Sequence, residues 1–263
     1  MKLKAVSVPK VWGRSDLPPP FGTTVTDPVG EIWFAAGDAP LPLLAKYIFT
    51  SERLSVQVHP NDEQARARGH ASGKAECWLI LDAGPGATIG LGTGQPMPAG
   101  ALRAASLSGD IEHLLDWRPV ARGDFLYVPA GTVHAIGAGI CLVEIQQYAD
   151  ITYRLYDYGR PRELHLDDGV AVADARPYAD PRARHVDLDA LAPETALRLV
   201  DGPFFTLDLT TQSHGHAAAQ ALLLPLVGTV TVAGESVDAG ACLALDTDTE
   251  WHLSTGGQLL VAR

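Results

Sequence analysis

Short apolar runs with period-two alternation dominate the chain, and turn-forming residues separate them. Between residues 31 and 158 the runs are EIWFAA, LAKYIFT, LSVQVH, CWLILD, DFLYVPA, CLVEIQQY and ITYRLYDY. Close spacing of such runs predicts a β-sandwich or barrel rather than alternating strand–helix units. The same pattern returns after residue 195 in FFTLDLT, ALLLPLVGTVTVAGESVDAGACLALD and GQLLVAR. We therefore expect an all-β-dominated protein built from two β-units.

Helical patterns are few and short. Asn61 follows Pro60 and is a suitable N-cap for a helix over NDEQARAR, residues 61–68. A second short helix is expected within LHLDDGVAVAD, residues 164–174. The helices therefore serve as insertions in a β-protein.

The two β-units are joined by a segment without sustained periodicity. Residues 175–195 are rich in Pro, Arg and Asp, which is typical of a connection. We expect a first domain over 1–170, a helix and linker connection over 171–195, and a second domain over 196–263.

Composition narrows the possible functions mainly by exclusion. The 263 residues are 46% hydrophobic and carry a formal net charge of −11. Nucleic-acid binding needs a basic face, so we expect no such partner, although a few local cations are enough to hold a small anion. No apolar run approaches the roughly 18 residues of a membrane span. Cys77, Cys141 and Cys242 are too few for a disulfide framework, so we expect a cytoplasmic protein without a membrane partner.

Two predicted strands carry polar pairs where a core would need apolar side chains. Gln57 and His59 are two residues apart, and Lys74 and Glu76 repeat this spacing after the first predicted helix. Period two places both members of a pair on the same strand face. Ser55 shares its face with Gln57 and His59. We therefore expect these faces to line a polar cavity.

A third polar position follows a Pro–x–Gly turn. GDFLYVPAGTVHAIG, residues 123–137, has the spacing of the second signature of the cupin barrel, and its histidine is His134. The turn redirects the next strand so that this imidazole points into the barrel mouth. The first cupin signature normally supplies two histidines at i and i+2 and a later glutamate, and Gln57, His59 and Glu76 occupy those places. One amide, two imidazoles and one carboxylate thus become available, a donor set that suits zinc.

Gln57 stands where cupins normally have the first histidine, and this difference narrows the choice of cupin family. The chain resembles class I mannose-6-phosphate isomerases, the zinc-dependent cupin enzymes of mannose metabolism, in their short bacterial form. The matching stretches follow the family order and are VWG (11–13), GEIW (30–33), LSVQVHP (54–60), GKAECW (73–78), GDFLYVPAGTVHAIG (123–137), EIQQYADITYRLYDYGR (144–160) and RELH (162–165). The resemblance implies a bicupin of the double-stranded β-helix (jelly-roll) type with a few short helices.

The resemblance also implies one zinc ion per chain. Its ligands would be Gln57, His59, Glu76 and His134. Iron is the main competitor among cupins, but iron dioxygenases usually keep the full histidine set.

The implied catalytic residues are Arg154, Glu144 and Lys74, and the implied substrate-binding residues are Ser55, Lys74 and Arg154. Glu144 and Arg154 lie on the two strands that follow His134. A plainer interpretation makes these two residues an exposed cross-strand ion pair of small energetic value. Ser55 is likewise interpretable as an ordinary strand serine.

The implied reaction interconverts mannose 6-phosphate and fructose 6-phosphate through a cis-enediol, with zinc-assisted proton transfer between C1 and C2. Such chemistry needs an acid–base group near C1 and C2 and positive charge near O1 and O2. We expect Glu144 to transfer the proton, while Arg154 and Lys74 supply positive charge. The alternatives are a non-catalytic sugar-phosphate-binding cupin and an isomerase of another sugar or sugar phosphate.

The second unit is expected to be a degenerate cupin without metal. Gly240 begins a motif-like run that ends near His252, but Asp246 replaces the proline of the signature. His214 and His216 have no later glutamate at cupin spacing. We expect this unit to pack against the first barrel.

Overall fold

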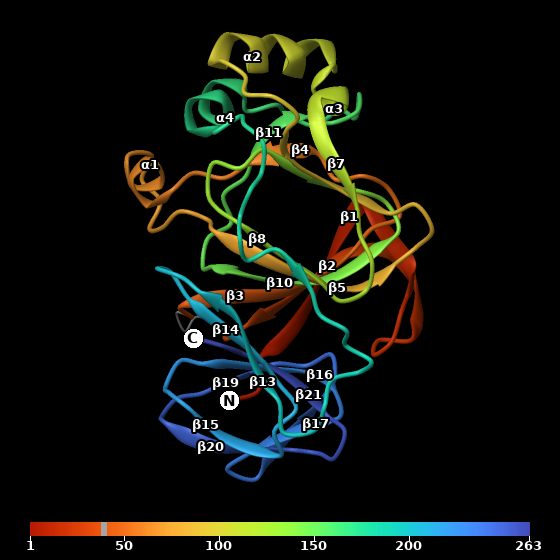
Figure 1. Cartoon of the computed structure of the whole chain (residues 1–263), viewed down its shortest axis with the longest axis vertical. Helices are drawn as coiled ribbons and strands as arrows, with labels where there is room; N and C mark the ends of the chain where they lie inside the picture. The colour runs from red at the N-terminus through yellow and green to blue at the C-terminus, as the bar shows by residue number, and fades with distance from the viewer. Residues whose placement is uncertain (38–40) are drawn as a thin grey trace.

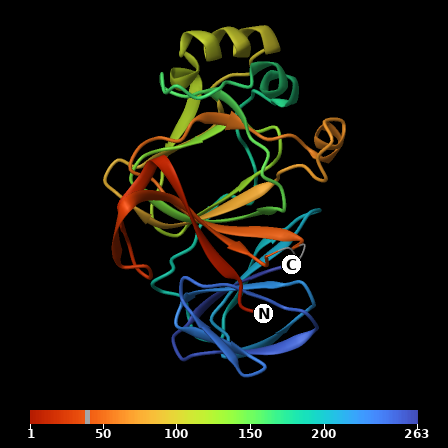
Figure 2. The same ribbon diagram turned by 180° about the vertical axis from the view of Figure 1, so that it is seen from behind.

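Four stacked β-sheets form the body of the protein, and short helices cover one end of the stack (Figure 1). The computed structural model describes residues 1–37 and 41–263. Figure 2 shows the same stack from behind, with both chain ends in its lower half. The all-β-dominated fold with few short helices is confirmed.

The first unit holds two facing sheets whose neighbouring strands are antiparallel. The seven-stranded sheet contains, in spatial order, β1 (Lys4–Leu17), β2 (Thr23–Ala35), β3 (Leu43–Phe49), β10 (Ile140–Gln147), β5 (Glu76–Ala83), β8 (Asp124–Val128) and β12 (Arg184–His185). The five-stranded sheet opposite contains β11 (Tyr153–Tyr156), β4 (Val56–Val58), β9 (His134–Ile136), β6 (Thr88–Thr93) and β7 (Leu115–Pro119).

The second unit repeats this arrangement of two sheets with fewer strands in each. Its first sheet contains β13 (Ala196–Asp201), β14 (Thr206–Thr210), β21 (Gln258–Ala262), β16 (Leu222–Val227) and β19 (Leu243–Ala244). Its second sheet contains β15 (His214–Ala217), β20 (Thr249–Leu253), β17 (Thr229–Val232) and β18 (Glu235–Asp238). VAGES forms the turn between β17 and β18, as predicted.

The domain limits expected from the sequence stay a prediction, and two pairings bear on them. Strand β12 comes from the segment expected to be a connection, yet it pairs with β8 of the first unit. At the other end of the chain, Lys2 forms an isolated bridge with Leu243 of the second unit. The two units are therefore linked by more than the segment between them.

In the described part of the chain four helices accompany the sheets, and two of them were predicted. Helix α1 (Asp62–Arg66) begins at Asn61, whose side chain accepts a hydrogen bond from the Gln64 N–H at 2.9 Å. The Gln64 side chain accepts in turn from the Asn61 N–H, which completes a capping box. Helix α4 (Leu166–Val172) lies within the second predicted segment.

Helices α2 (Ala99–Ser108) and α3 (Ile111–Leu114) were not predicted. Helices α2 and α4 lie over the outer face of the five-stranded sheet of the first unit (Figure 1). Among the described residues, no helix is long and apolar enough to cross a lipid bilayer.

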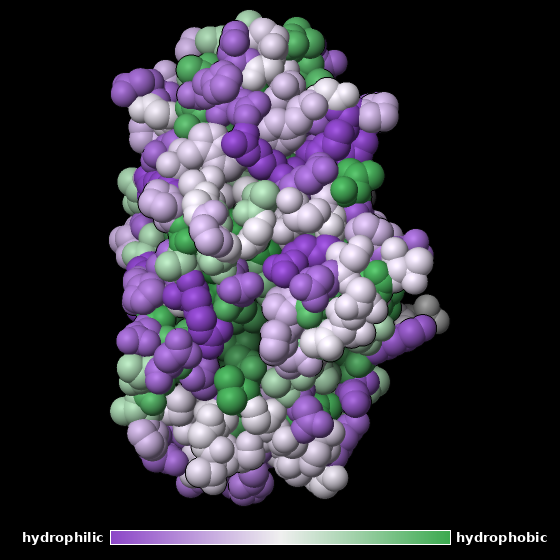
Figure 3. Space-filling view, turned by 90° about the vertical axis from the view of Figure 1, so that its right-hand side faces the viewer, coloured by the Kyte–Doolittle hydropathy of each residue, from purple (hydrophilic) through white to green (hydrophobic). Residues whose placement is uncertain are grey.

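Apolar side chains fill the gaps between successive sheets. Inside the first unit the two sheets meet through residues such as Trp78 and Ile136. A larger cluster joins the seven-stranded sheet to the second unit, with Tyr47 and Leu79 on one side and Leu260 on the other. In the side view of Figure 3, hydrophobic residues gather in the hollow where the two units meet. The predicted packing of the second unit against the first is thus observed.

Candidate functional site

Two buried histidines and a buried glutamate converge between the two sheets of the first unit. Ligand atoms of His59, Glu76 and His134 all lie within 4.8 Å of one another. The Glu76 Oε1 atom is 3.6 Å from His59 Nε2 and 3.4 Å from His134 Nε2. His59 follows β4 and His134 begins β9 in one sheet, while Glu76 begins β5 in the facing sheet.

Gln57, the fourth predicted ligand, lies beside this group. It is the register partner of His134 across β4 and β9, and its amide is 3.2 Å from His134 Nε2. Because a half-turn about the last side-chain bond exchanges amide oxygen and nitrogen, the same position offers an oxygen to a cation. The structure therefore brings all four predicted ligands together.

The Pro–x–Gly turn explains how His134 reaches the cluster. Gly131 adopts φ of 87°, a conformation that strongly favours glycine, and its N–H donates to the His59 carbonyl at 2.8 Å. Beyond the turn, Val133 and Ala135 pack under the helices. Strand alternation then directs His134 to the opposite face, toward Glu76.

Hydrogen bonds to backbone carbonyls fix both imidazoles in the tautomer that suits a metal ligand. His59 Nδ1 is 2.8 Å from the Ile151 carbonyl, and His134 Nδ1 is 2.9 Å from the Thr132 carbonyl. A carbonyl only accepts, so each Nδ1 carries the proton and each Nε2 keeps its lone pair for the cluster.

Burial keeps both imidazoles neutral. It lowers the pKa of His134 to about 3, and burial together with the Lys74 ammonium lowers the pKa of His59. Glu76 Oε1 has no hydrogen-bond partner among the described residues. Two neutral imidazoles and an unsatisfied buried carboxylate oxygen fit a cation better than an apolar core.

Lys74 contacts the cluster directly. Its Nζ lies 2.8 Å from Glu76 Oε2 and 3.1 Å from His59 Nε2. Burial disfavours the ammonium, but the carboxylates of Glu144 and Glu76 outweigh this effect and raise the pKa of Lys74. Burial acts against the Glu76 carboxylate as well, yet Lys74 and His59 hold the pKa of Glu76 well below its usual range. Both groups are therefore charged at neutral pH.

Glu144 lies next to this cluster on the facing sheet and is also buried. The Trp78 indole N–H donates to its Oε2 at 3.0 Å. Its Oε1 is 3.1 Å from the Lys46 ammonium and 3.9 Å from the Lys74 ammonium. Glu144 is thus not part of an exposed pair with Arg154, and that plainer interpretation is wrong.

Arg154 lies on the opposite wall, where it is the register partner of Gln57 across β11 and β4. Its Nη1 donates to the Glu163 carbonyl at 2.7 Å. Ser55 is buried, and its hydroxyl is 3.3 Å from the Gln57 amide oxygen, so the two side chains share a face as predicted.

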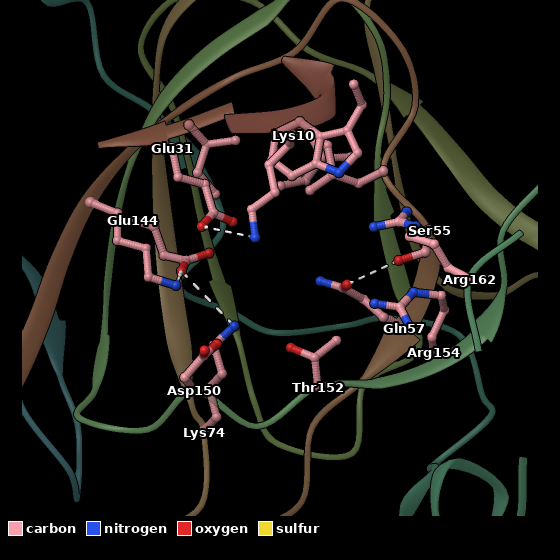
Figure 4. A pocket seen from close by; sticks show the side chains of 15 residues that line it. Lys10, Glu31, Ser55, Gln57, Lys74, Glu144, Asp150, Thr152, Arg154 and Arg162 are labelled. Carbon is pink, nitrogen blue, oxygen red and sulfur yellow. Dashed lines mark hydrogen bonds and ion pairs between the residues drawn. The ribbon is translucent and has the colours of Figure 1, made fainter. Parts of the chain in front are cut away.

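Ser55, Gln57, Lys74, Glu144 and Arg154 line a cavity of about 230 Å³. The cluster of His59, Glu76 and His134 contacts this lining through Gln57 and Lys74. Ser55, Gln57, Arg154 and Arg162 lie on one side of the cavity, and Lys74, Glu144 and Glu31 lie on the other (Figure 4). The charged side chains that line it are five basic residues, Lys10, Lys46, Lys74, Arg154 and Arg162, and three acidic residues, Glu31, Glu144 and Asp150. The cavity is therefore locally cationic although the chain carries a net charge of −11, which suits an anionic ligand.

Sequence reasoning missed several of these lining residues. The missed residues are Lys10, Trp12, Glu31, Lys46, Asp150, Thr152 and Arg162. A signal existed for Lys46, because it interrupts a strand that is otherwise apolar, and lysines are rarely buried without a partner. The contact of Glu31 is visible only in the fold, where its carboxylate accepts a hydrogen bond from Trp33 Nε1 at 2.6 Å.

The histidines of the second unit lie on an exposed sheet face. His214 and His252 are register partners across β15 and β20, with ring centroids 6.5 Å apart. The absence of a metal from this unit stays a prediction.

Known proteins resemble this chain in sequence and in fold. A Streptococcus mutans protein named mannose-6-phosphate isomerase is 39% identical over 183 residues, which cover 67% of this chain and 57% of that protein. A Bacillus subtilis protein named mannose-6-phosphate isomerase ManA is 45% identical over 140 residues, which cover 51% of this chain and 44% of that protein. The chain thus matches about half the length of these curated relatives. No model of a known protein family matches the chain.

The crystal structure of the mannose 6-phosphate isomerase from Bacillus subtilis superposes on the whole fold. The TM-score is 0.78 at 26% identity, and the match covers 100% of this chain and 98% of that chain. The fold and the His–Glu–His cluster define a two-unit cupin with a site able to hold a metal ion. In sequence and in fold, the chain is similar to proteins named mannose-6-phosphate isomerase, which agrees with the class I resemblance of its motifs.

Proposed function

We propose that the protein is an aldose–ketose isomerase that interconverts mannose 6-phosphate and fructose 6-phosphate. The observation that carries this proposal is the meeting of three features in one cavity. These are Gln57 and Lys74, which contact the cluster of His59, Glu76 and His134, the buried carboxylate of Glu144 and a cationic lining. The names of the curated relatives support the same activity.

We infer that zinc is the metal and that Gln57, His59, Glu76 and His134 hold it. Neutral imidazoles, a carboxylate and an amide form a nitrogen and oxygen set typical of catalytic zinc. When bound, zinc supplies positive charge that stabilises the oxyanion of an enediolate.

Glu144 is our candidate for proton transfer between C1 and C2. The Trp78 N–H holds one carboxylate oxygen, which fixes the orientation of the group. The Lys46 ammonium lies 3.1 Å from the other oxygen and holds that side of the group. A carboxylate held in this way returns the proton to the neighbouring carbon without moving far.

Arg154 and Lys74 lie on opposite walls and bring positive charge to the substrate oxygens. A guanidinium on the wall beside Gln57 is suited to stabilise negative charge that develops at O1 or O2. The Lys74 ammonium touches Glu76 and His59, so it reaches a sugar oxygen next to the metal ligands. Ser55 offers a hydroxyl on the same face as Gln57.

Steady-state assay of the purified, zinc-replete protein with mannose 6-phosphate tests the proposal, with fructose 6-phosphate as the detected product. We expect turnover, and we expect Glu144→Gln to abolish most of it while leaving zinc content unchanged. Binding of mannose 6-phosphate without turnover would instead identify a sugar-phosphate-binding cupin. Turnover of glucose 6-phosphate or a free sugar alone would identify an isomerase of different specificity.

A further inference from the structure

A buried aspartate follows strand β11 and binds two arginines. Asp157 is 2% exposed, and its two oxygens each accept a hydrogen bond at 2.6 Å from Arg162, one from Nε and one from Nη2. Arg160 Nη2 also lies 2.9 Å from Asp157 Oδ1. A bidentate pair of this kind holds the planar guanidinium in one orientation.

The two arginines point to different places. Arg160 donates to the Arg53 carbonyl at 2.7 Å and lies over the Tyr158 ring, away from the candidate active site. Arg162 lines the cavity itself. Because its pair with Asp157 uses Nε and Nη2, the Nη1 group lies outside that pair and is available to a ligand.

Arg162 lies near a second guanidinium. Figure 4 shows Arg162 on the same side of the cavity as Arg154 and Ser55. Burial lowers the pKa of Arg154, and the charge of Arg162 lowers it further. Two cations held close together in a partly buried wall repel each other, and a bound dianion removes that repulsion.

Ser55 connects this wall to the candidate metal ligand Gln57. Ser55 lies one two-residue step from Gln57, about 7 Å along an extended chain. A ligand whose reacting end lies at Gln57 can therefore extend its far end toward Ser55 and Arg162, which line the same cavity.

We propose that Asp157 is a positioning residue that holds Arg162 in place to bind the 6-phosphate of the substrate, with Ser55 as a further donor. This inference rests on the proposed function of the same site. Arg162 then binds the phosphate end of the substrate, and Arg154 stays close to O1 and O2, the reacting oxygens.

Asp157→Asn is the first test, because it keeps the shape of the side chain and removes its charge. We expect KM for mannose 6-phosphate to rise about 10- to 100-fold, the range for losing one charge-assisted contact, with kcat within about twofold. The inhibition constant of inorganic phosphate should rise in parallel. Arg162→Gln should give the same pattern, since it removes the guanidinium while Asp157 keeps its pair with Arg160.

Asp180→Asn provides the matched control. Asp180 binds Arg182 in the same bidentate manner, at 2.8 and 2.5 Å, and neither residue lines the active-site cavity. We expect this variant to leave KM and phosphate inhibition unchanged. Thermal melting of both aspartate variants shows whether a general loss of stability accounts for any effect.

Several results would overturn the inference. They are a normal KM in Arg162→Gln, a fall in kcat without a rise in KM, and an equal rise in KM in the Asp180→Asn control. Calorimetric binding of inorganic phosphate separates this inference from the proposed function. If the wild-type protein binds phosphate and Asp157→Asn does not, the phosphate site holds even where mannose 6-phosphate is not turned over. Equal phosphate binding by both proteins would refute the site itself.

Discussion

Replacing Arg154 by alanine separates catalysis from binding in this cavity. The substitution removes the guanidinium on the wall beside Gln57 and one hydrogen bond, from Nη1 to the Glu163 carbonyl. A single hydrogen bond of this type contributes about 1 kcal/mol to stability, so the variant should fold. Its Nε atom is buried without a partner among the described residues, so losing that atom removes an unsatisfied group.

The effect on turnover should be much larger than the effect on stability. If the guanidinium stabilises the developing enediolate, Arg154→Ala lowers kcat about 10²- to 10³-fold, the scale for removing one preorganised donor. Zinc content should remain at the wild-type level, because Arg154 is not a predicted ligand. Arg154→Lys should restore little activity, since a point charge lacks the planar fork of the guanidinium.

Steady-state kinetics on protein of measured zinc content is the deciding assay. The kcat and KM of Arg154→Ala are compared with those of the wild type at equal metal occupancy. A raised KM with kcat nearly intact would show that Arg154 only binds the substrate, and our assignment would be wrong. An equal loss of zinc would show that the substitution acts through the metal site instead.

Three other results should follow from the buried groups. Glu76→Ala should lose most bound metal by elemental analysis, because it removes the only charged ligand from the cluster, and full metal retention would contradict the ligand set. Lys46→Met should lower the free energy of unfolding of the metal-free protein by about 3–5 kcal/mol, because Glu144 loses its nearest counter-ion. Urea unfolding measures this loss, and an added Glu144→Gln should recover most of it. Finally, the metal-free protein should lose stability as the pH falls from 6.5 toward 3, because the pKa of His134 is about 3 when folded and its ordinary value is 6.5. His134→Asn should flatten that dependence, and an unchanged slope would exclude His134 as its source.

The central part of the site was predictable because its geometry is local. Gln57 and His59 share a strand face by period two, and the Pro–x–Gly turn determines the direction of His134. The spacing of each motif therefore contains most of the information about where its side chain points. That Gln57, His59, Glu76 and His134 lie close together was implied only by the resemblance to a known family, because no local rule relates the position of Glu76 to those of the other three residues.

The missed residues depend on contacts between distant segments. Asp157 and Arg162 lie in a loop without periodicity, so only the folded chain shows that they pair and which arginine reaches the cavity. Lys10 joins the cavity because β1 and β2 form a long hairpin at its edge. Helix α2 was missed for a simpler reason, since it starts after Pro98 without a side-chain cap.

One face of strand β5 contributes to the candidate metal cluster, and its other face belongs to the apolar junction between the two units. Glu76 and Trp78 face the interior of the first unit, where Glu76 belongs to the candidate metal cluster, while Cys77 and Leu79 face the second unit. A single inserted or deleted residue in this strand would exchange the two sets, because strand side chains alternate with period two. The carboxylate would then enter the apolar junction, and a thiol would take its place in the candidate metal cluster. Natural variation in length should therefore be confined to the connecting loops, and engineered insertions in β5 should abolish metal binding and the docking of the two units together.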